Sequence, residues 1–404
     1  MKHTLRMAAT LIATATLASA AYAQKSYGPG ATDTEIKIGN IMPYSGPASA
    51  YGTIGKTEAA YFKMINDKGG INGRKINFIS YDDAYSPPKA VEQARKLVES
   101  DDVLLIFNSL GTPSNTAIQK YMNERKVPQL FVATGATKWD DPKTWPWTMG
   151  WQPSYQAEGR IYAQYILKNI PDAKIAILSQ NDDFGKDYVK GFMDGLGGKL
   201  KPVIHLTYEV GDPTIDSQMV RLKDSGANVF YDVTTPKFAS QAIRKAGEMK
   251  WNATHFLANV SGSVGSVFKP AGFENGQGVL STAYMKDATD PTWKDDAGFK
   301  TWTAFMEKYM PDADRTNANH VYGYNVAKTM AYVLEKCGND LTRENVMKQA
   351  ASMKNLELEM LLPGITINTS ATDFAPIQQE QMQRFKGEGW ERFGPVFDAG
   401  ASNG

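Results

Sequence analysis

The feature that most constrains the fold is an alternation of short apolar runs with segments of helical periodicity. Runs rich in Ile, Val, Leu and Phe, typical of buried strands, stand at 35–42, 76–81, 103–107 and 129–132. Segments with apolar residues at helical spacing alternate with them, at 53–67, 87–100 and 116–125. A β-α repeat of roughly 30 residues is typical of parallel sheets. We therefore predict an α/β fold with a largely parallel sheet and helices on both faces.

The same alternation restarts after a loop at 139–147 that contains three tryptophans and two prolines. Helices are predicted at 155–169, 187–196, 214–225 and 236–249, and strands at 174–179, 202–208, 228–233 and 255–260. Together with the chain length of 404 residues, this repetition predicts two similar lobes. Further helices are predicted at 297–309, 319–337 and 342–353, with strands and turns from residue 360 onwards.

The N-terminus has the pattern of a secretory signal peptide. Lys2 and Arg6 supply the positive charge, residues 7–20 form an apolar core, and Ala21-Tyr22-Ala23 fits a cleavage site. A membrane anchor is the other interpretation, but the core is shorter than the ~18–20 apolar residues that a span needs. We expect residues 1–23 to be removed after Ala23 and the mature protein to be exported to the periplasm.

The charge balance and the scarcity of cysteine and histidine exclude several classes of function. Loss of Lys2 and Arg6 with the signal lowers the 44 basic side chains to 42, against 43 acidic ones, which disfavours nucleic acid as a partner. Cys337 is the only cysteine, so no disulfide can form within the chain. The histidines are not at metal-ligand spacing, so we expect no metal site and no cofactor.

Two loops that follow predicted strands have the composition of a small-molecule site. Leu110–Asn115 reads Leu-Gly-Thr-Pro-Ser-Asn, and Ala133–Thr137 reads Ala-Thr-Gly-Ala-Thr. Parallel sheets place ligands at the carboxyl ends of their strands, where backbone N–H groups and hydroxyls suit an anion. We therefore expect these loops to form the floor of a site for a carboxylate.

Several aromatic residues stand near predicted strand ends, helix starts or lobe crossings. They are Tyr51, Tyr155, Phe184, Tyr322 and Tyr324. Each one alone is more often part of a core than in contact with a ligand. Together they predict a cleft that stacks on an apolar or aromatic ligand.

The motifs of common enzymes are missing. Ser261-Gly-Ser-Val-Gly265 lacks the first glycine of a nucleophile elbow, and neither a Walker A motif nor a dinucleotide-binding glycine pattern is present. Three acidic pairs, at 82–83, 140–141 and 182–183, are assigned to turns and helix caps rather than to acid-base chemistry. We expect a binding protein and not an enzyme.

A series of motifs resembles one family. Met42-Pro-Tyr-Ser-Gly-Pro47, Tyr51-Gly52, Asn66-Asp-Lys-Gly-Gly-Ile-Asn-Gly73, Tyr81-Asp-Asp83 and Lys89-Ala-Val91 occur in this order, and Asp183-Phe-Gly-Lys186 follows later. They resemble the leucine/isoleucine/valine-binding family of periplasmic receptors, which serve ABC importers. The resemblance covers essentially the whole mature chain. It implies a type I periplasmic binding fold, in which two Rossmann-like lobes with mainly parallel sheets are joined by three crossover strands around a ligand cleft.

The resemblance also implies a division of the chain and a set of ligand contacts. The first lobe would comprise 24–150 and 283–363, and the second 151–282 and 364–404. The first lobe would hold the ligand carboxylate at Gly111, Thr112 and the Gly135-Ala136-Thr137 loop. Tyr51 would line the cleft, Tyr322 or Tyr324 its rim, and the second-lobe contacts would be Tyr155, Phe184 and Thr234.

Two departures from the family bear on the ligand. Amino-acid receptors of this family carry an acid that pairs with the ligand ammonium, and Val260 stands at that place here. A buried ammonium without its anion costs several kcal/mol, so an amino acid is disfavoured. Leu110-Gly-Thr-Pro also replaces the family's hydroxyl-rich run, and Tyr85 and Leu110 stand where the family has a disulfide.

We therefore expect a monomeric receptor that closes on a small carboxylate with an apolar or aromatic body and delivers it to a membrane permease. Three alternatives remain at this point: a receptor for aliphatic amino acids, a receptor for an amide or urea with the same fold, and a secreted two-lobed enzyme.

Overall fold

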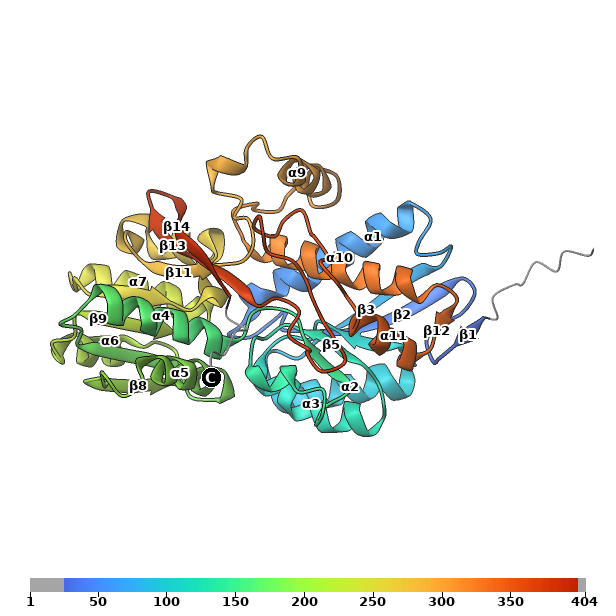
Figure 1. Cartoon of the computed structure of the whole chain (residues 1–404), viewed down its shortest axis with the longest axis horizontal. Coiled ribbons are helices and arrows are strands. Elements are labelled where there is room, and N and C mark those ends of the chain that lie inside the picture. The colour runs from blue at the N-terminus through green and yellow to red at the C-terminus, as the bar shows by residue number, and fades with distance from the viewer. Residues whose placement is uncertain (1–24, 399–404) are drawn as a thin grey trace, which may run out of the picture.

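The computed structural model describes residues 25–398 and has two lobes, each built on one main sheet (Figure 1). The predicted signal segment, residues 1–23, lies outside the described residues. In Figure 1 the right-hand lobe carries β2 to β6 with helices from both ends of the chain, and the left-hand lobe carries β7 to β11. The predicted α/β fold with two lobes is confirmed.

The first lobe has a five-stranded, fully parallel sheet in the order β3-β2-β4-β5-β6. Its strands are β2 (Glu35–Met42), β3 (Lys75–Asp82), β4 (Leu105–Phe107), β5 (Gln129–Val132) and β6 (Thr148–Gly150). Its helices are α1 (Gly52–Asp67), α2 (Pro87–Arg95), α3 (Thr112–Glu124), α9 (Ala297–Tyr309), α10 (Asn319–Cys337) and α11 (Arg343–Ala350). A small two-stranded sheet pairs β1 (Ser26–Tyr27) with β12 (Asp340–Leu341).

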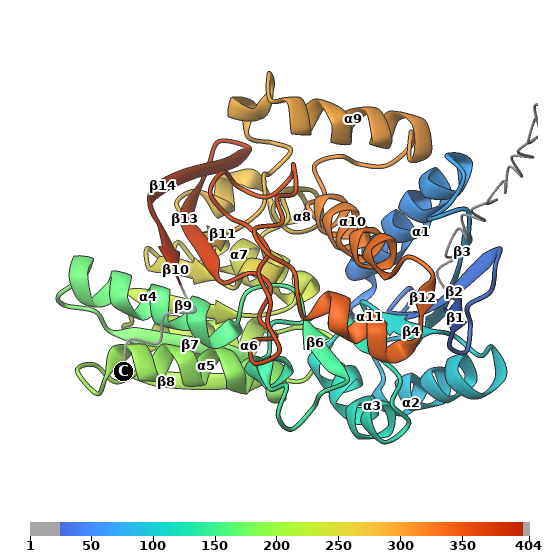
Figure 2. The same ribbon diagram turned by 45° about the vertical axis from the view of Figure 1, so that its right-hand side comes forward.

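Alternate residues of the central strands pack against helices on opposite faces of this sheet. Leu105 and Phe107 of β4 lie in the core shared with α1 and α10, while Ile106 lies in the core shared with α2 and α3. This is the period-two pattern that a strand buried on both faces requires. Figure 2 shows α10 beside α1, although the two helices are far apart in sequence. The predicted coverage of both faces is confirmed.

The second lobe has a seven-stranded sheet in the order β14-β13-β11-β10-β9-β7-β8. Its strands are β7 (Ile175–Gln180), β8 (Ile204–Tyr208), β9 (Val229–Val233), β10 (Thr254–Leu257), β11 (Leu280–Ala283), β13 (Gln379–Lys386) and β14 (Gly389–Asp398). Its helices are α4 (Tyr155–Asn169), α5 (Asp183–Leu196), α6 (Asp216–Asp224), α7 (Pro236–Glu248) and α8 (Lys269–Ala271). β7 to β11 are parallel, whereas β13 and β14 are antiparallel additions at one edge.

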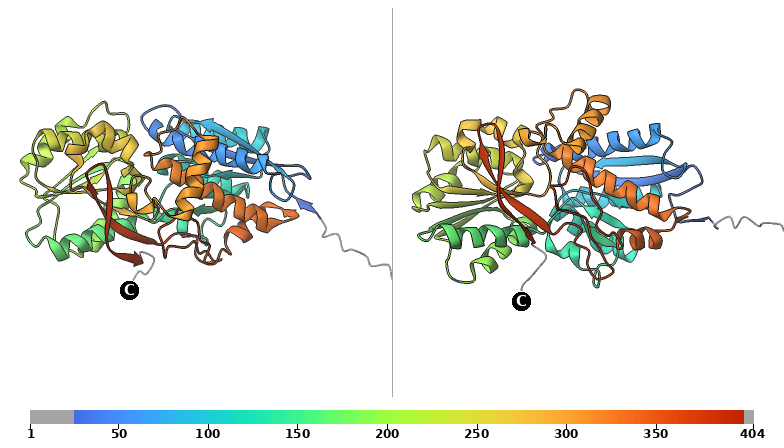
Figure 3. Two further views of the ribbon diagram at one scale, coloured as in Figure 1. Left: turned by 90° about the horizontal axis from the view of Figure 1, so that it is seen from above. Right: turned by 45° about the horizontal axis from the view of Figure 1, so that its top comes forward.

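The chain passes between the lobes three times, after β6, after β11 and before β13. Figure 3 shows the last passage, which leads into the antiparallel pair of β13 and β14 on the second lobe. Ile365, Ile367 and Ile377, which precede β13, belong to the core of the first lobe. The first lobe is therefore built from segments that lie both before and after β7 to β11 in the chain.

Two of the predicted boundaries that differ from the structure lie beside the cavity. α3 begins at Thr112, four residues before the predicted start, because Pro113 fits the first turn of a helix. The strand predicted at 255–260 ends at Leu257 and turns into a short helical segment, Asn259–Ser261. That turn is fixed by a buried carboxylate, since Glu158 Oε1 accepts a hydrogen bond from the Asn259 N–H at 2.7 Å.

Helices α4 and α5 pack unusually closely because glycines lie at their contact. A Cβ added to Gly191 would stand 2.2 Å from the Cα and the carbonyl oxygen of Gln156, and one added to Gly159 would stand 2.7 Å from the backbone of Tyr188 and Phe192. These contacts are with backbone, which cannot move aside as a flexible side chain can. The orientation of α4, and with it Tyr155 at its first position, depends on this approach.

We expect Gly191→Ala to lower the free energy of unfolding by at least about 2 kcal/mol, because the added methyl group must separate two packed helices. Urea denaturation of the mature protein measures this loss. The matched control is Lys190→Ala, at the neighbouring exposed position, which removes only a surface ion pair with Asp194 and should cost less than about 0.5 kcal/mol. Equal, small effects of both substitutions would contradict the packing argument.

Candidate functional site

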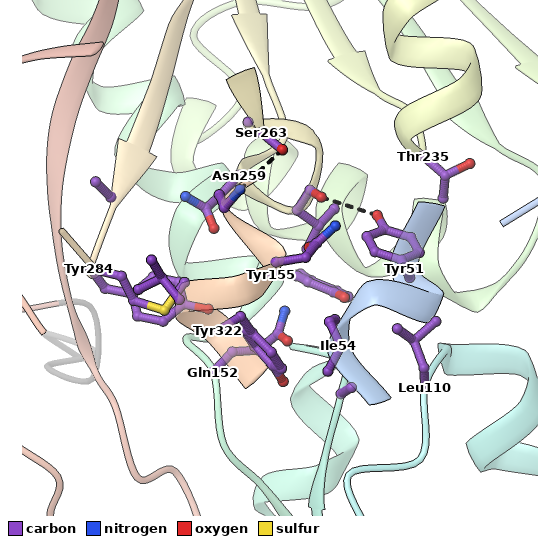
Figure 4. Close-up of a pocket in the computed structure, with 18 of the residues that line it drawn as sticks. Tyr51, Ile54, Leu110, Gln152, Tyr155, Thr235, Asn259, Ser263, Tyr284 and Tyr322 are labelled. Carbon is purple, nitrogen blue, oxygen red and sulfur yellow. Dashed lines mark hydrogen bonds between the residues drawn. The ribbon is translucent and has the colours of Figure 1, made fainter. Parts of the chain in front are cut away.

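A cavity of about 100 Å³ lies between the lobes, at the carboxyl ends of the strands of both sheets. The first lobe contributes Tyr51 and Ile54 from the start of α1, and Gly111 and Thr112 from the start of α3. The second lobe contributes Tyr155, Phe184, Thr235, Asn259 and Val260. Figure 4 shows the aromatic rings of Tyr51, Tyr155, Tyr284 and Tyr322 around this space. The cavity stands where the arrangement of parallel strands predicts a ligand site.

The first of the two predicted loops lies on the cavity wall. Gly111 precedes the first turn of α3 and has φ of 96°, a conformation that favours glycine. Thr112 Oγ1 and Thr134 Oγ1 are hydrogen-bonded to each other at 2.5 Å, beside the carboxyl ends of β4 and β5. The N–H groups in the first turn of a helix have no intrahelical acceptor and carry a partial positive charge. This corner of the cavity therefore suits an anionic group.

The second predicted loop supports the wall from behind. Gly135, Ala136 and Thr137 do not line the cavity, although Ala133 just before them does. The Thr137 N–H and hydroxyl both donate to Asp187 Oδ2 of α5, at 2.9 and 3.0 Å. A Cβ at Gly135 would stand 2.8 Å from the ring of Tyr155, so this glycine lets the ring lie against the loop.

The predicted second-lobe aromatics reach the cavity together. The rings of Tyr155 and Phe184 are perpendicular at 5.4 Å, and Tyr155 also stacks on Tyr188 at 4.2 Å. Thr234 points elsewhere, because its hydroxyl donates to Asp232 Oδ1 at 2.6 Å, and the neighbouring Thr235 lines the cavity instead. Strand β9 ends at Val233, directly before these two threonines. Neighbouring residues of an extended chain point in opposite directions, so only one of the two threonines can face the cavity.

Val260 lines the cavity and also forms a hydrogen bond through its backbone carbonyl. Its carbonyl oxygen accepts a hydrogen bond from the Tyr51 hydroxyl at 3.1 Å, which Figure 4 marks with a dashed line. Tyr51 belongs to the first lobe and Val260 to the second, so the bond joins the two lobes across the cavity. The structure therefore has its lobes in contact at the site.

Of the two candidate tyrosines in α10, Tyr322 faces the cavity. Its ring is perpendicular to Trp151 at 5.1 Å, and its hydroxyl accepts from Asn108 Nδ2 at 3.3 Å. Tyr324 donates to Glu359 at 2.7 Å and packs against Tyr61, away from the cavity. Positions two apart on a helix point in different directions, which accounts for the difference.

Several further wall residues were not predicted as ligand contacts, among them Tyr85, Gln152, Tyr284 and Asp287. Tyr85 follows the Asp82-Asp83 pair at the end of β3, so its strand-end position was a usable signal. Tyr284 directly follows β11, so its position at a strand end also indicated a candidate ligand contact. Gln152 and Asp287 lie on passages between the lobes, and no local pattern marks them.

Lys286 and Asp287 are the charged residues on the wall among residues 25–398. Lys286 Nζ pairs with Asp296 Oδ1 at 2.6 Å and lies over the ring of Trp293, so its charge is compensated outside the cavity. Asp287 Oδ1 accepts a hydrogen bond from the backbone N–H of Thr289 at 2.8 Å. Burial raises the pKa of Asp287 above its usual value.

A buried acid supports the second-lobe wall. Glu158 accepts from the hydroxyls of Tyr162 and Tyr188, both at 2.7 Å, in addition to the N–H of Asn259. Burial raises the pKa of Glu158 from 4.5 to about 7, and the hydrogen bonds from the two tyrosines oppose this. The wall segment at Asn259 therefore rests on a carboxyl group that titrates near neutral pH.

The acidic pairs have the roles in turns and caps that the sequence predicted. Asp182 caps α5 by accepting from the N–H groups of Phe184 and Gly185. Asp82 accepts from the N–H groups of Tyr44, Ser45 and Ala84 in a turn, and Asp141 accepts from that of Thr144. Within residues 25–398 no group of three His, Cys, Asp or Glu side chains is placed to hold a metal ion. None of the helices in that range is long and apolar enough to cross a membrane.

A family model described as "Periplasmic binding protein" matches residues 35–389. The chain belongs to this family. The match includes both lobes and every residue of the cavity wall, and it confirms the resemblance drawn from the sequence motifs.

The chain is also similar to several known proteins. The chain is 24% identical over 336 residues to Leu/Ile/Val-binding protein homolog 1 of Brucella suis, with 81% of this chain and 86% of that protein covered. A branched-chain amino acid ABC transporter structure from Thermus thermophilus with bound valine superposes with a TM-score of 0.82 at 17% identity, covering 90% of this chain and 96% of the other. A fatty acid ABC transporter substrate-binding protein from Thermomonospora curvata superposes with a TM-score of 0.79 at 21% identity, covering 93% and 96%. At these identities the structures support the fold and leave the ligand open.

We expect Glu158→Gln to change how stability depends on pH. The folded state holds the Glu158 proton more tightly than the unfolded chain, so the wild-type protein loses stability as the pH rises from about 4.5 to about 7. The glutamine cannot titrate, so the stability of the variant relative to the wild type should rise across this window. Urea denaturation at pH 4.5, 6 and 8 measures the difference, and parallel curves for the two proteins would contradict the assignment.

Proposed function

We propose that this protein is an exported receptor of an ABC importer, and that it binds a small carboxylate with an apolar or aromatic body. The observation that carries the proposal is the chemistry of the cavity wall, which combines the hydroxyl-bearing start of α3 with a surround of tyrosine rings. Membership of the periplasmic binding protein family supports the receptor role. The protein acts by holding and releasing its ligand, as a monomer, without chemical conversion.

The carboxylate is held at the start of α3 in this proposal. The Thr112 hydroxyl and the N–H groups of Thr112 and Ser114 donate to it, since Pro113 has no N–H, and the helix dipole stabilises its charge. This grip uses no cationic side chain, and Lys286, the one lysine on the wall among residues 25–398, is already paired with Asp296. Charge-assisted hydrogen bonds of this kind are roughly twice as strong as neutral ones.

The body of the ligand lies among the rings of Tyr51, Tyr155, Phe184, Tyr284 and Tyr322. A cavity of about 100 Å³ is close in size to cavities of ~150 Å³ that hold benzene. Each well-placed ring contact contributes about 0.5–1.5 kcal/mol beyond burial of area. A single aromatic ring or a short branched chain is therefore the body that fits.

Binding is coupled to closure of the lobes. We place the hinge at the three passages between the lobes, near residues 150 and 283 and between residue 363 and β13. The ligand bridges the start of α3 and the second-lobe aromatics, so it favours the closed form over the open one. The membrane permease then recognises the closed form. Removal of residues 1–23 on export remains part of the proposal.

A second candidate, a receptor for an aliphatic amino acid, is favoured by one wall residue. Asp287 supplies a carboxylate on the cavity wall that has no cationic partner among residues 25–398, and it could pair with a ligand ammonium in place of the acid that Val260 replaces. Among the relatives, the Brucella protein is named for leucine, isoleucine and valine. The two candidates differ in whether the ligand carries a positive charge.

We expect benzoate or a hydroxycinnamate to bind with micromolar affinity, about −8 kcal/mol, in titration calorimetry. Thr112→Val should weaken that binding about tenfold, because it removes a donor to a charged group worth roughly 1.5–3 kcal/mol. Thr116→Val is the matched control, since this threonine lies one turn further along α3 and bonds only to the backbone of Thr112. Tight leucine binding with no heat from either aromatic acid would overturn the proposal.

Asp287→Asn distinguishes the two candidates directly. In the carboxylate receptor the substitution removes a repulsive charge, so benzoate should bind equally well or up to about threefold more tightly, measured by the same calorimetry. In the amino-acid receptor it removes the partner of the ammonium, and leucine binding should weaken by at least about a hundredfold. The control is Asp295→Asn, because Asp295 is exposed and its substitution leaves the wall intact. Asp290→Asn is not suitable, because Asp290 caps a neighbouring turn.

A further inference from the structure

We propose that Ser263 and Gly265 form a clasp that holds the two lobes closed. In this clasp a short segment of the second lobe and the start of α10 in the first lobe cap each other across the cleft. The inference rests on closure of the lobes, which is part of the proposed function, and not on the identity of the ligand.

The second-lobe half of the clasp is the run Ser261-Gly-Ser-Val-Gly265, to which the sequence assigned no catalytic role. It leads into a short helical segment, Val264–Phe268, whose apolar side chains belong to a core of the second lobe. Ser263 caps this segment, because its Oγ accepts a hydrogen bond from the Ser266 N–H at 3.4 Å. Gly262 and Ser263 also line the cavity, so the clasp lies on the cavity wall.

The Ser263 hydroxyl also serves the first lobe. Its Oγ accepts a hydrogen bond from the Ala318 N–H and donates one to Asn317 Oδ1, both at 3.2 Å. Ala318 directly precedes α10, and N–H groups at the start of a helix have no acceptor within that helix. A serine oxygen is a preferred acceptor for such groups, and here it comes from the other lobe. The Ser263 hydroxyl carries one of the dashed lines in Figure 4.

The contact is reciprocal. The Gly265 N–H, at the start of the second-lobe segment, donates to the carbonyl oxygen of Thr316 in the first lobe at 2.9 Å. Each lobe thus supplies an acceptor for an N–H group that begins a helical segment of the other lobe. Separation of the lobes breaks both bonds, so the pair favours the closed form. Because no ligand atom takes part, this preference does not depend on what the cavity binds.

Glycine at position 265 lets the two backbones approach this closely. A Cβ added there would stand 2.7 Å from Thr316 Oγ1 and 2.9 Å from the backbone nitrogen of Asn317. The nearest atoms all belong to the first lobe, so an added methyl group would obstruct closure rather than the folding of the second lobe. The φ of Gly265 lies outside the left-handed region, so the backbone itself accepts alanine.

The clasp also positions part of the cavity wall. Ala318 and Asn319 line the cavity at the start of α10, the helix that carries Tyr322. Asn317 Oδ1 accepts from the Asn319 N–H at 3.1 Å as well as from the Ser263 hydroxyl, so the contact between the lobes is joined to the cap of the helix. Closure therefore fixes the first turn of α10 as the cavity forms.

The first test removes only the Ser263 hydroxyl. Spin labels at K120C on α3 and K190C on α5, both exposed positions, report the separation of the lobes by pulsed electron spin resonance in a C337A background. We expect Ser263→Ala to shift the ratio of closed to open forms of the ligand-free protein about fivefold towards the open form, because a cap across the cleft is lost. Ser266→Ala is the matched control, since its hydroxyl lies in the same segment and has no hydrogen-bond partner among the described residues.

Gly265→Ala tests the same contact without removing a hydrogen-bonding group. The added methyl group should shift the ratio by at least about tenfold towards the open form, because it cannot fit between the two backbones. Gly211→Ala is its control, because a Cβ at this exposed second-lobe position meets no atom within 4 Å. Thermal unfolding of each variant confirms that it is folded.

A distance distribution for either variant that matches its control overturns the clasp, and so does a ligand-free parent that shows the open separation alone. Stopped-flow measurement should give a dissociation rate of benzoate about fivefold faster for Ser263→Ala and an unchanged association rate, because the clasp forms after the ligand has entered. Failure of benzoate to bind the parent would overturn the proposed carboxylate site, while the distance distributions would still decide the clasp.

Discussion

The direction of the strands decides where this protein can hold a ligand. Because β2 to β6 and β7 to β11 are each parallel, every strand of these runs ends at the same edge of its sheet, and the two edges face each other. Loop residues, helix starts and unpaired backbone groups therefore converge on one space. The three chain passages connect the two lobes and keep these two edges facing each other across the cavity.

Tyrosine hydroxyls are the second constraint, since a buried hydroxyl without a partner is costly. Tyr51 satisfies its hydroxyl on the carbonyl oxygen of Val260, across the cleft. When the lobes open, the Tyr51 hydroxyl and the Val260 carbonyl are exposed to water. When the lobes close, the two groups pair again across the cleft. A tyrosine ring that lines the cavity thus also contributes to the closed form.

The sequence predicted the fold and part of the cavity wall. The β-α alternation predicted parallel sheets, and strand-end chemistry predicted Gly111 and Thr112, because both depend on local patterns. Thr137 was predicted as a contact but lies behind the wall, since Asp187 of the other lobe draws its hydroxyl away. Asp287 was missed because it lies on a chain passage without a periodic pattern. Tyr85 was missed although it follows a strand end, because a left-handed turn directs its ring into the cavity.

The central claim is that the cavity holds a carboxylate that carries no α-amino group. Its most direct test is the identity of the molecule that accompanies the protein when it is isolated from the periplasm of its own cells. Native mass spectrometry, followed by denaturing extraction and chemical analysis, identifies that molecule without requiring candidate ligands to be chosen beforehand. The account predicts a small monocarboxylic acid with an aromatic or compact apolar body. Leucine, valine or any other α-amino acid in the extract would contradict it.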